Sequence, residues 1–131
     1  WAVEGKKSQG DKVLRPCFEN PQWNDLTSLI SKLSNIRKNN AVLNYGEYEN
    51  VFIMNEQLIF KRVLHSDNYK KEILVALNIS ENNYYLKPNN NGYGAFAGIF
   101  GKWKNLITDN IENYNGAINL EPNSFQILES I

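Results

Sequence analysis

The spacing of apolar residues changes once along this chain, and this change limits the possible folds more than any other feature. Between Asn24 and Lys38 the apolar residues recur at helical spacing and form a single stripe. The stripe consists of Leu26, Leu29, Ile30, Leu33 and Ile36. After Asn39 and Asn40 the spacing becomes that of β-strands and remains so to the end of the chain. The sequence therefore predicts one amphipathic helix followed by a β-domain.

The ends of the predicted helix carry residues that suit helix termini. Asn24 is a favourable N-cap, and Asp25 places a negative charge in the first turn. Arg37 and Lys38 place positive charges in the last turn, where they complement the helix dipole. The helix is therefore expected to run from Asp25 to Lys38. Residues 1–22 show no sustained periodicity and are expected to be an irregular loop.

Seven short stretches rich in β-branched and aromatic residues follow the helix and are predicted strands. They are residues 48–53, 57–64, 72–79, 84–87, 104–108, 117–120 and 124–129. The nearly continuous apolar run at 73–79 is typical of a central strand that is covered on both faces. Strands of this length and spacing favour a mainly β fold, an antiparallel Greek-key β-sandwich.

Composition limits the classes of partner. The 14 basic residues balance the 14 acidic ones, and no run of like charges is longer than a pair. We therefore expect neither nucleic acid nor a membrane as a partner. Cys17 is the only cysteine, which makes a reduced, cytoplasmic setting the default expectation. Because the only methionine is Met54 and the chain opens on Trp1, we expect a piece of a longer protein.

Candidate sites for metals, cofactors and glycans are weak. Cys17 and the single histidine, His65, lie far apart, and they leave Asp109 and Glu112 as oxygen donors. Those groups are too few for a metal site, so no metal and no cofactor is expected. The triplet Asn78-Ile79-Ser80 fits the glycosylation acceptor pattern, but its place in a predicted strand favours a chance match.

Candidate catalytic groups are also weak. Glu47 and Glu49 share one face of a predicted strand, at a spacing that suits two carboxylates acting on a glycosidic bond. Such pairs are far more often solvated strand edges, so we assign no catalytic residue here. His65 is followed by Ser66 and Asp67, but consecutive residues of a turn rarely point at one another.

Aromatic residues gather within twenty positions of the second half of the chain. They are Tyr84, Tyr85, Tyr93, Phe96, Phe100 and Trp103. Flat rings stack on the apolar faces of sugars, whereas packing in a core is the commoner role. Because Phe96 and Phe100 are expected in the core, a carbohydrate-binding platform would centre on Tyr93 and Trp103.

Several short sequence motifs follow one another along the chain in an order that is informative about its family. They are Glu4-Gly5-Lys6-Lys7, Leu14-Arg15-Pro16, Leu29-Ile30, Ile36-Arg37-Lys38, Ala41-Val42-Leu43, Tyr45-Gly46-Glu47-Tyr48, Ile59-Phe60-Lys61-Arg62, residues 73–80 and residues 118–129. In this order the chain resembles the end of alpha-amylase superfamily glycoside hydrolases, above all the cyclomaltodextrinase, neopullulanase and alpha-glucosidase branch. One departure is Asn40, where that family usually has proline.

The resemblance implies a division at residue 40. Residues 1–40 would be the last loop and last helix of a catalytic TIM barrel, and residues 41–131 its C-terminal β-domain, domain C. The catalytic carboxylates of the family lie at strand ends earlier in the barrel, so none is carried over to this chain. The implied function is non-catalytic stabilisation of a barrel that acts on α-glucans, with the barrel as partner. Without the barrel, the helix at 25–38 is expected to self-associate; the alternative function is a starch- or maltodextrin-binding module.

Overall fold

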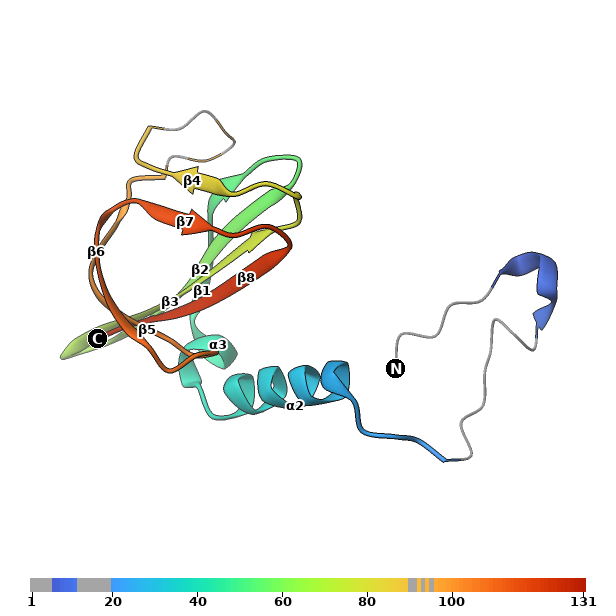
Figure 1. The fold of residues 1–131 in the computed structure, drawn as a ribbon. Helices are drawn as coiled ribbons and strands as arrows, with labels where there is room; N and C mark the ends of the chain where they lie inside the picture. Colours follow the sequence, from blue (N-terminus) through green and yellow to red (C-terminus); the bar gives the residue numbers. More distant parts are fainter. Residues whose placement is uncertain (1–5, 12–19, 90–91, 93, 95) are drawn as a thin grey trace. The chain divides into compact units, whose positions relative to one another are not determined.

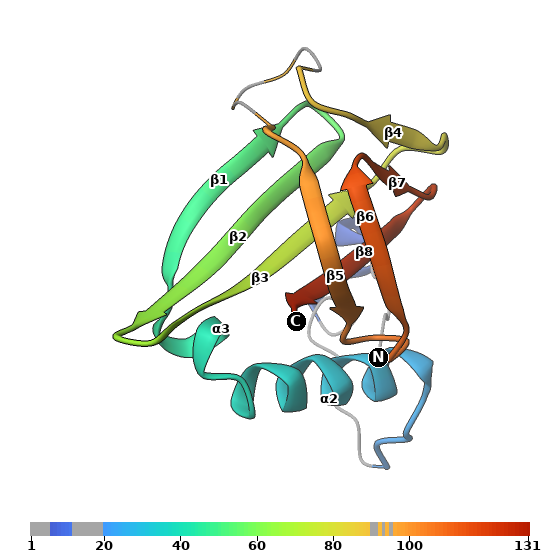
Figure 2. The same cartoon turned by 90° about the vertical axis from the view of Figure 1, so that its left-hand side faces the viewer.

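The computed structural model describes residues 6–11, 20–89, 92, 94 and 96–131. The chain divides into two compact units, residues 1–36 and residues 37–131, which Figures 1 and 2 show from two sides. The first unit holds a short 3-10 helix, η1 (Lys7–Gln9), and most of helix α2 (Asp25–Lys38). The second unit holds a short helix and the described strands.

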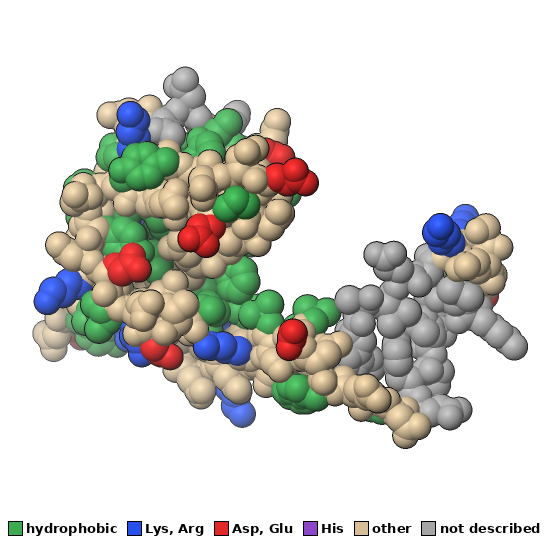
Figure 3. All heavy atoms as spheres, in the orientation of Figure 1, with side chains coloured by type: hydrophobic (Ala, Val, Ile, Leu, Met, Phe, Trp, Pro, Cys, Tyr) green, Lys and Arg blue, Asp and Glu red, His purple; other side chains and the backbone are tan. Residues whose placement is uncertain are grey.

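Helix α2 has the predicted bounds and the predicted cap. The Oδ1 atom of Asn24 accepts hydrogen bonds from the backbone N and the Oγ1 of Thr27, each at 2.9 Å. None of the residues of α2 is buried, and the side chain of Ile30 is 55% exposed. Figure 3 shows apolar side chains at the surface along α2. The apolar stripe of the helix is therefore formed but lacks a complete cover among the described residues.

Helix α3 (Ala41–Tyr45) follows α2 and was not expected from the sequence. The Oδ1 of Asn40 accepts a hydrogen bond from the backbone N of Val42 at 3.2 Å, which caps this helix. The Nδ2 of Asn40 donates to Glu129 at 3.0 Å and so ties the cap to the sheet. A proline at position 40 would make neither side-chain bond. Asn40 thus has a structural use at this position.

The main sheet of the second unit is antiparallel throughout and has six strands in the order β1-β2-β3-β8-β5-β6. These strands are β1 (Glu47–Ile53), β2 (Gln57–Ser66), β3 (Tyr69–Asn78), β5 (Ile99–Asn105), β6 (Ile111–Gly116) and β8 (Ser124–Ser130). A second sheet pairs β4 (Tyr84–Leu86) with β7 (Ile118–Leu120). Strand β8 lies beside β5 and not beside β7, which precedes it, and this return is the Greek-key relationship. The predicted mainly β, antiparallel sandwich is confirmed.

Two strands differ from the prediction. The strand expected at residues 104–108 is β5, which ends at Asn105, and β6 was not predicted. The Oδ1 of Asn105 accepts a hydrogen bond from the backbone N of Ile107 at 2.8 Å, and this Asx turn ends β5. Gly98 and Gly101 have positive φ. In the sequence such glycines look like turn residues, although Gly101 lies inside β5.

The core lies between one face of the main sheet, here called the inner face, and the small sheet. The inner face contributes Phe52, Ile59, Leu74, Ala76, Trp103 and Leu128. The small sheet contributes Leu86, Ile118 and Leu120. Phe96 comes from the segment that leads into β5, and Ile99 is the first residue of β5. Because residues two apart on a strand share a face, the intervening residues of β2, β3 and β8 form the opposite face, here called the outer face.

Candidate functional site

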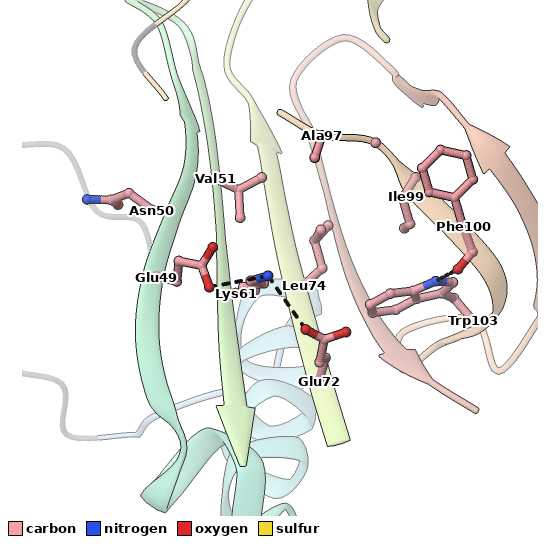
Figure 4. Close-up of a pocket in the computed structure, with 11 residues that line it drawn as sticks. Glu49, Asn50, Val51, Lys61, Glu72, Leu74, Ala97, Ile99, Phe100 and Trp103 are labelled. Atoms are coloured by element: carbon pink, nitrogen blue, oxygen red, sulfur yellow. Dashed lines mark hydrogen bonds and ion pairs between the residues drawn. The ribbon is translucent and has the colours of Figure 1, made fainter. Parts of the chain in front are cut away.

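A hollow of about 290 Å³ opens on the inner face, beside the core, and is the pocket drawn in Figure 4. Glu49 of β1, Lys61 of β2 and Glu72 of β3 form its charged side. Glu49 lies opposite Lys61 in the β1–β2 register, so their side chains share the inner face. Phe100 and Trp103 of β5 line the other side. We call this pocket the inner hollow.

The charged groups of the inner hollow are joined in ion pairs. The Nζ of Lys61 lies 3.2 Å from Glu49 Oε2 and 3.5 Å from Glu72 Oε1. The Nζ of Lys70 lies 2.8 Å from the same oxygen of Glu72. Figure 4 shows Lys61 reaching from β2 between the two carboxylates. Each carboxylate therefore faces an ammonium group that neutralises it.

These ion pairs set the protonation of Glu72. Burial by itself raises the pKa of this carboxyl, but hydrogen bonds and attraction from Lys70 and Lys61 outweigh burial and lower the pKa below its ordinary value. Glu72 is consequently ionised at neutral pH. A general acid in glycoside hydrolysis needs the opposite shift, a raised pKa that keeps the proton available. The inner hollow is therefore a poor acid/base site.

Trp103, one of the two predicted carbohydrate-binding residues, lies in the core. It is only 7% exposed, and its Nε1 donates to the backbone O of Phe100 at 2.9 Å. A ring so deeply packed offers no open face for stacking on a sugar, because its apolar surface is already used in the core. Tyr93, the other predicted residue, lies outside the described residues.

Phe100 differs from its prediction. Phe96 is buried, as expected, but Phe100 is 62% exposed and not part of the core. Its ring packs on backbone: a Cβ added at Gly98 would lie 2.6 Å from Phe100 Cε2, and one at Gly116 would lie 3.3 Å from the ring. The aromatic ring thus covers two positions without side chains, the residue before β5 and the last residue of β6, a device that stabilises glycine in sheets. Sequence reasoning missed this role because it depends on the β5–β6 register.

Glu47 and Glu49, the best candidate carboxylate pair from the sequence, are both exposed on β1. Both line one hollow together with His65 and Lys70, and Glu49 also lines the inner hollow. Glu47 lies opposite Val63 in the β1–β2 register. His65 is exposed and lies opposite Lys70 in the β2–β3 register. In the described part of the chain, no hydrogen bond links the side chain of His65 to Ser66 or Asp67. Among these described residues no nucleophile has a base beside it.

The oxygen donors Asp109 and Glu112 have separate partners. The Nζ of Lys104 lies 2.8 Å from Asp109 Oδ1. Burial and the nearby charge and hydrogen bond of Glu112 raise the pKa of Tyr114 to about 12. Within the part of the chain that the structure describes, no three His, Cys, Asp or Glu side chains gather as they would around a metal ion.

Asn78 of the glycosylation triplet is 1% exposed, and its amide is fully engaged. Its Nδ2 donates to the backbone oxygens of Asn82 at 2.9 Å and of residues 120 and 121 at 3.2 and 2.9 Å. Its Oδ1 accepts from Gln57 Nε2 at 2.9 Å and from Ser80 Oγ at 2.8 Å. The residue is therefore a buried cross-link, and in the folded chain its amide is out of reach of a modifying enzyme.

Comparison with known proteins adds no relative. No protein-family model matches the chain, and no curated protein matches it. The resemblance to the alpha-amylase superfamily therefore remains a hypothesis. None of the described helices combines the length and apolar character that crossing a membrane would take.

Proposed function

We propose that this chain is the non-catalytic C-terminal β-domain of a cytoplasmic alpha-amylase-type glycosidase, in which it packs on the catalytic barrel and stabilises it. The observation that carries the proposal is the open stripe of α2. A helix with one apolar stripe ordinarily buries that stripe, yet no residue of α2 is buried in this chain. A barrel surface that covers Leu26 and Ile30, both exposed here, would complete the packing.

The ion pairs of the inner hollow support a role without catalysis. Hydrolysis of a glycosidic bond uses one protonated and one ionised carboxyl group. Glu49 and Glu72 are both bound by Lys61, and Lys70 adds a second contact to Glu72. We expect no sugar release from maltooligosaccharides or nitrophenyl α-glucoside above a buffer blank. Turnover that Glu49→Gln or Glu72→Gln abolishes would contradict this proposal.

The partnership is tested with the coding region that precedes Trp1, expressed as a separate chain. We expect that chain to be a barrel that degrades α-glucans, and to gain thermal stability when the 131-residue chain is added. An Ile30→Asp variant should give less of this gain, because it places a charge in the exposed stripe. A preceding region without catalytic carboxylates at barrel strand ends would refute the assignment to this family.

Exposed rings favour a second candidate function, a module that binds starch or maltodextrin. Tyr85 of β4 and Phe100 of β5 are each 62% exposed and offer flat faces to solvent. Native gels cast with soluble starch test this function, since only a binding module is retarded. Retardation that both Tyr85→Ala and Phe100→Ala reduce would support it, whereas migration equal to that in a starch-free gel would exclude it.

A further inference from the structure

The outer face of the main sheet is apolar along its central strands. Two cross-strand rows form this apolar surface: Leu58, Leu77 and Phe125 in one row, and Phe60, Val75 and Ile127 in the next. Only Ile127 of these six is buried. Helix α3 contacts β2 and β3 within the second unit and buries Val42, so it covers one end of the face.

Arg62 lies in the third row of the same face. It is opposite Tyr48 on β1 and Ile73 on β3, and Ile73 is in turn opposite Glu129 on β8. The Nε of Arg62 is buried and has no hydrogen-bond partner. A buried donor without a partner destabilises a protein, and a cation among apolar side chains does so more strongly. Arg62 is thus a cation in an apolar row without an ion-pair partner among the described residues.

The nearest carboxylate of this row is already in use. Glu129 Oε1 lies 2.8 Å from the Nζ of Lys71 and accepts a hydrogen bond from Asn40 at 3.0 Å. No carboxylate among the described residues forms an ion pair with Arg62. A carboxylate that neutralises the Arg62 guanidinium would therefore come from a partner that covers the face.

We propose that the outer face docks an apolar partner surface that carries a carboxylate, and that this carboxylate pairs with Arg62. The inference rests on the proposed function, and it assigns that surface to the catalytic barrel. Planar guanidinium binds a carboxylate through two parallel hydrogen bonds, which fixes the orientation of the two surfaces as well as their affinity.

Charge argues against a second copy of this chain as the partner. Two copies related by a two-fold axis would present the same face to each other. That face contributes Arg62 and Lys71, while its carboxylate, Glu129, is already bound by Lys71 and Asn40. A second copy would therefore bring like charges together and supply no acceptor for Arg62.

The test uses synthetic amphipathic helical peptides as probes and the whole 131-residue chain as the receptor. One peptide carries a single glutamate at the border of a leucine face, and its twins carry glutamine or lysine there. Calorimetry measures the affinities, and changes in the NMR chemical shifts of the backbone amides locate the bound peptide. We expect roughly tenfold tighter binding of the glutamate peptide than of its glutamine twin, with shifts on β2, β3 and β8.

Two variants and a matched control assign the preference to Arg62. Arg62→Met should abolish the preference for glutamate without lowering the urea midpoint, because it removes an unsatisfied buried donor. Arg62→Glu should reverse the preference in favour of the lysine peptide. Arg37→Met makes the same chemical change at the end of α2 and should leave the preference intact.

Equal binding of the glutamate and glutamine peptides, shifts confined to other surfaces, or no binding of any peptide would overturn the inference. Dimers that Arg62→Glu strengthens would also overturn it, because they would make a second copy the occupant. A glutamate preference in a chain whose preceding coding region lacks a barrel would leave the docking face standing and refute only the glycosidase as its source.

Discussion

The side-chain Nδ2 of Asn78 donates a hydrogen bond to the backbone O of Leu120 at 3.2 Å, and this contact joins the end of β3 to the end of β7. Asn78 bonds to both sheets at this corner through buried groups, since its Oδ1 also accepts from Gln57 on β2. Buried amides whose donors and acceptors are all satisfied make a packing arrangement specific.

Replacement of Asn78 should therefore destabilise the second unit strongly. In Asn78→Ala the backbone oxygens of Asn82 and residues 120–121 lose their donor, and Gln57 loses its acceptor. We expect a loss of about 2–4 kcal/mol in the free energy of unfolding, measured by urea titration. Asn113→Ala, on an exposed position of β6, is the control and should change the midpoint little. Similar midpoints for the two variants would contradict the structural role of Asn78.

The pKa of Glu72 predicts a loss of stability in acid. Its folded-state pKa is lowered from 4.5, so the unfolded chain binds this proton more readily than the folded chain does. The stabilisation is complete well above pH 4.5 and is lost as the pH falls through the folded-state pKa. Thermal midpoints measured from about pH 7 down to about pH 3 should fall less steeply in Glu72→Gln than in the wild type. Parallel profiles for the two proteins would show that Glu72 has no such linkage.

The sequence predicted features that depend on one short segment better than features that depend on contacts between distant segments. The bounds of α2 follow from Asn24 and from a stripe within a single segment, and the structure has the same bounds. Strand β6 was missed because most of its residues are polar and its place depends on pairing with β5. The bonds of Lys61 to Glu72 and the isolation of Arg62 depend on the register of strands that lie apart in sequence. Register is set by the whole sheet, so these features needed a structure.

The open stripe of α2 predicts association of the isolated chain. Exposed apolar area favours contact by about 25 cal/mol per Å², and Ile30 contributes a side chain that is 55% exposed. Sedimentation over a concentration series should show association of the wild type and less association of Leu29→Lys and Ile30→Lys. A wild type that stays monomeric, together with unchanged stability of both variants, would mean that the stripe is not an interface.

Gly98, just before β5, and Gly101, within β5, allow a matched test that separates the effect of packing from the effect of backbone strain. Gly98 and Gly101 have φ values of +103° and +82°, which an alanine adopts only with strain. A Cβ at Gly98 would also lie 2.6 Å from the ring of Phe100 and 3.0 Å from the O of Gly116, whereas nothing lies within 4 Å of one at Gly101. Gly101→Ala should therefore cost about 1 kcal/mol of unfolding free energy, from strain alone.

Gly98→Ala should cost more, roughly 2–4 kcal/mol, because the ring of Phe100 must move off the backbone that it covers. The double variant Gly98→Ala/Phe100→Ala separates the ring from the other causes, since it removes the clash with the ring and keeps both the strain and the 3.0 Å approach to the O of Gly116. Its loss relative to Phe100→Ala alone should be smaller than the loss of Gly98→Ala and no smaller than the loss of Gly101→Ala when all are measured by urea titration. If Gly98→Ala and Gly101→Ala cost the same, the contact between Phe100 and the glycine backbone does not constrain β5, and the exposed ring of Phe100 is free to move toward a ligand.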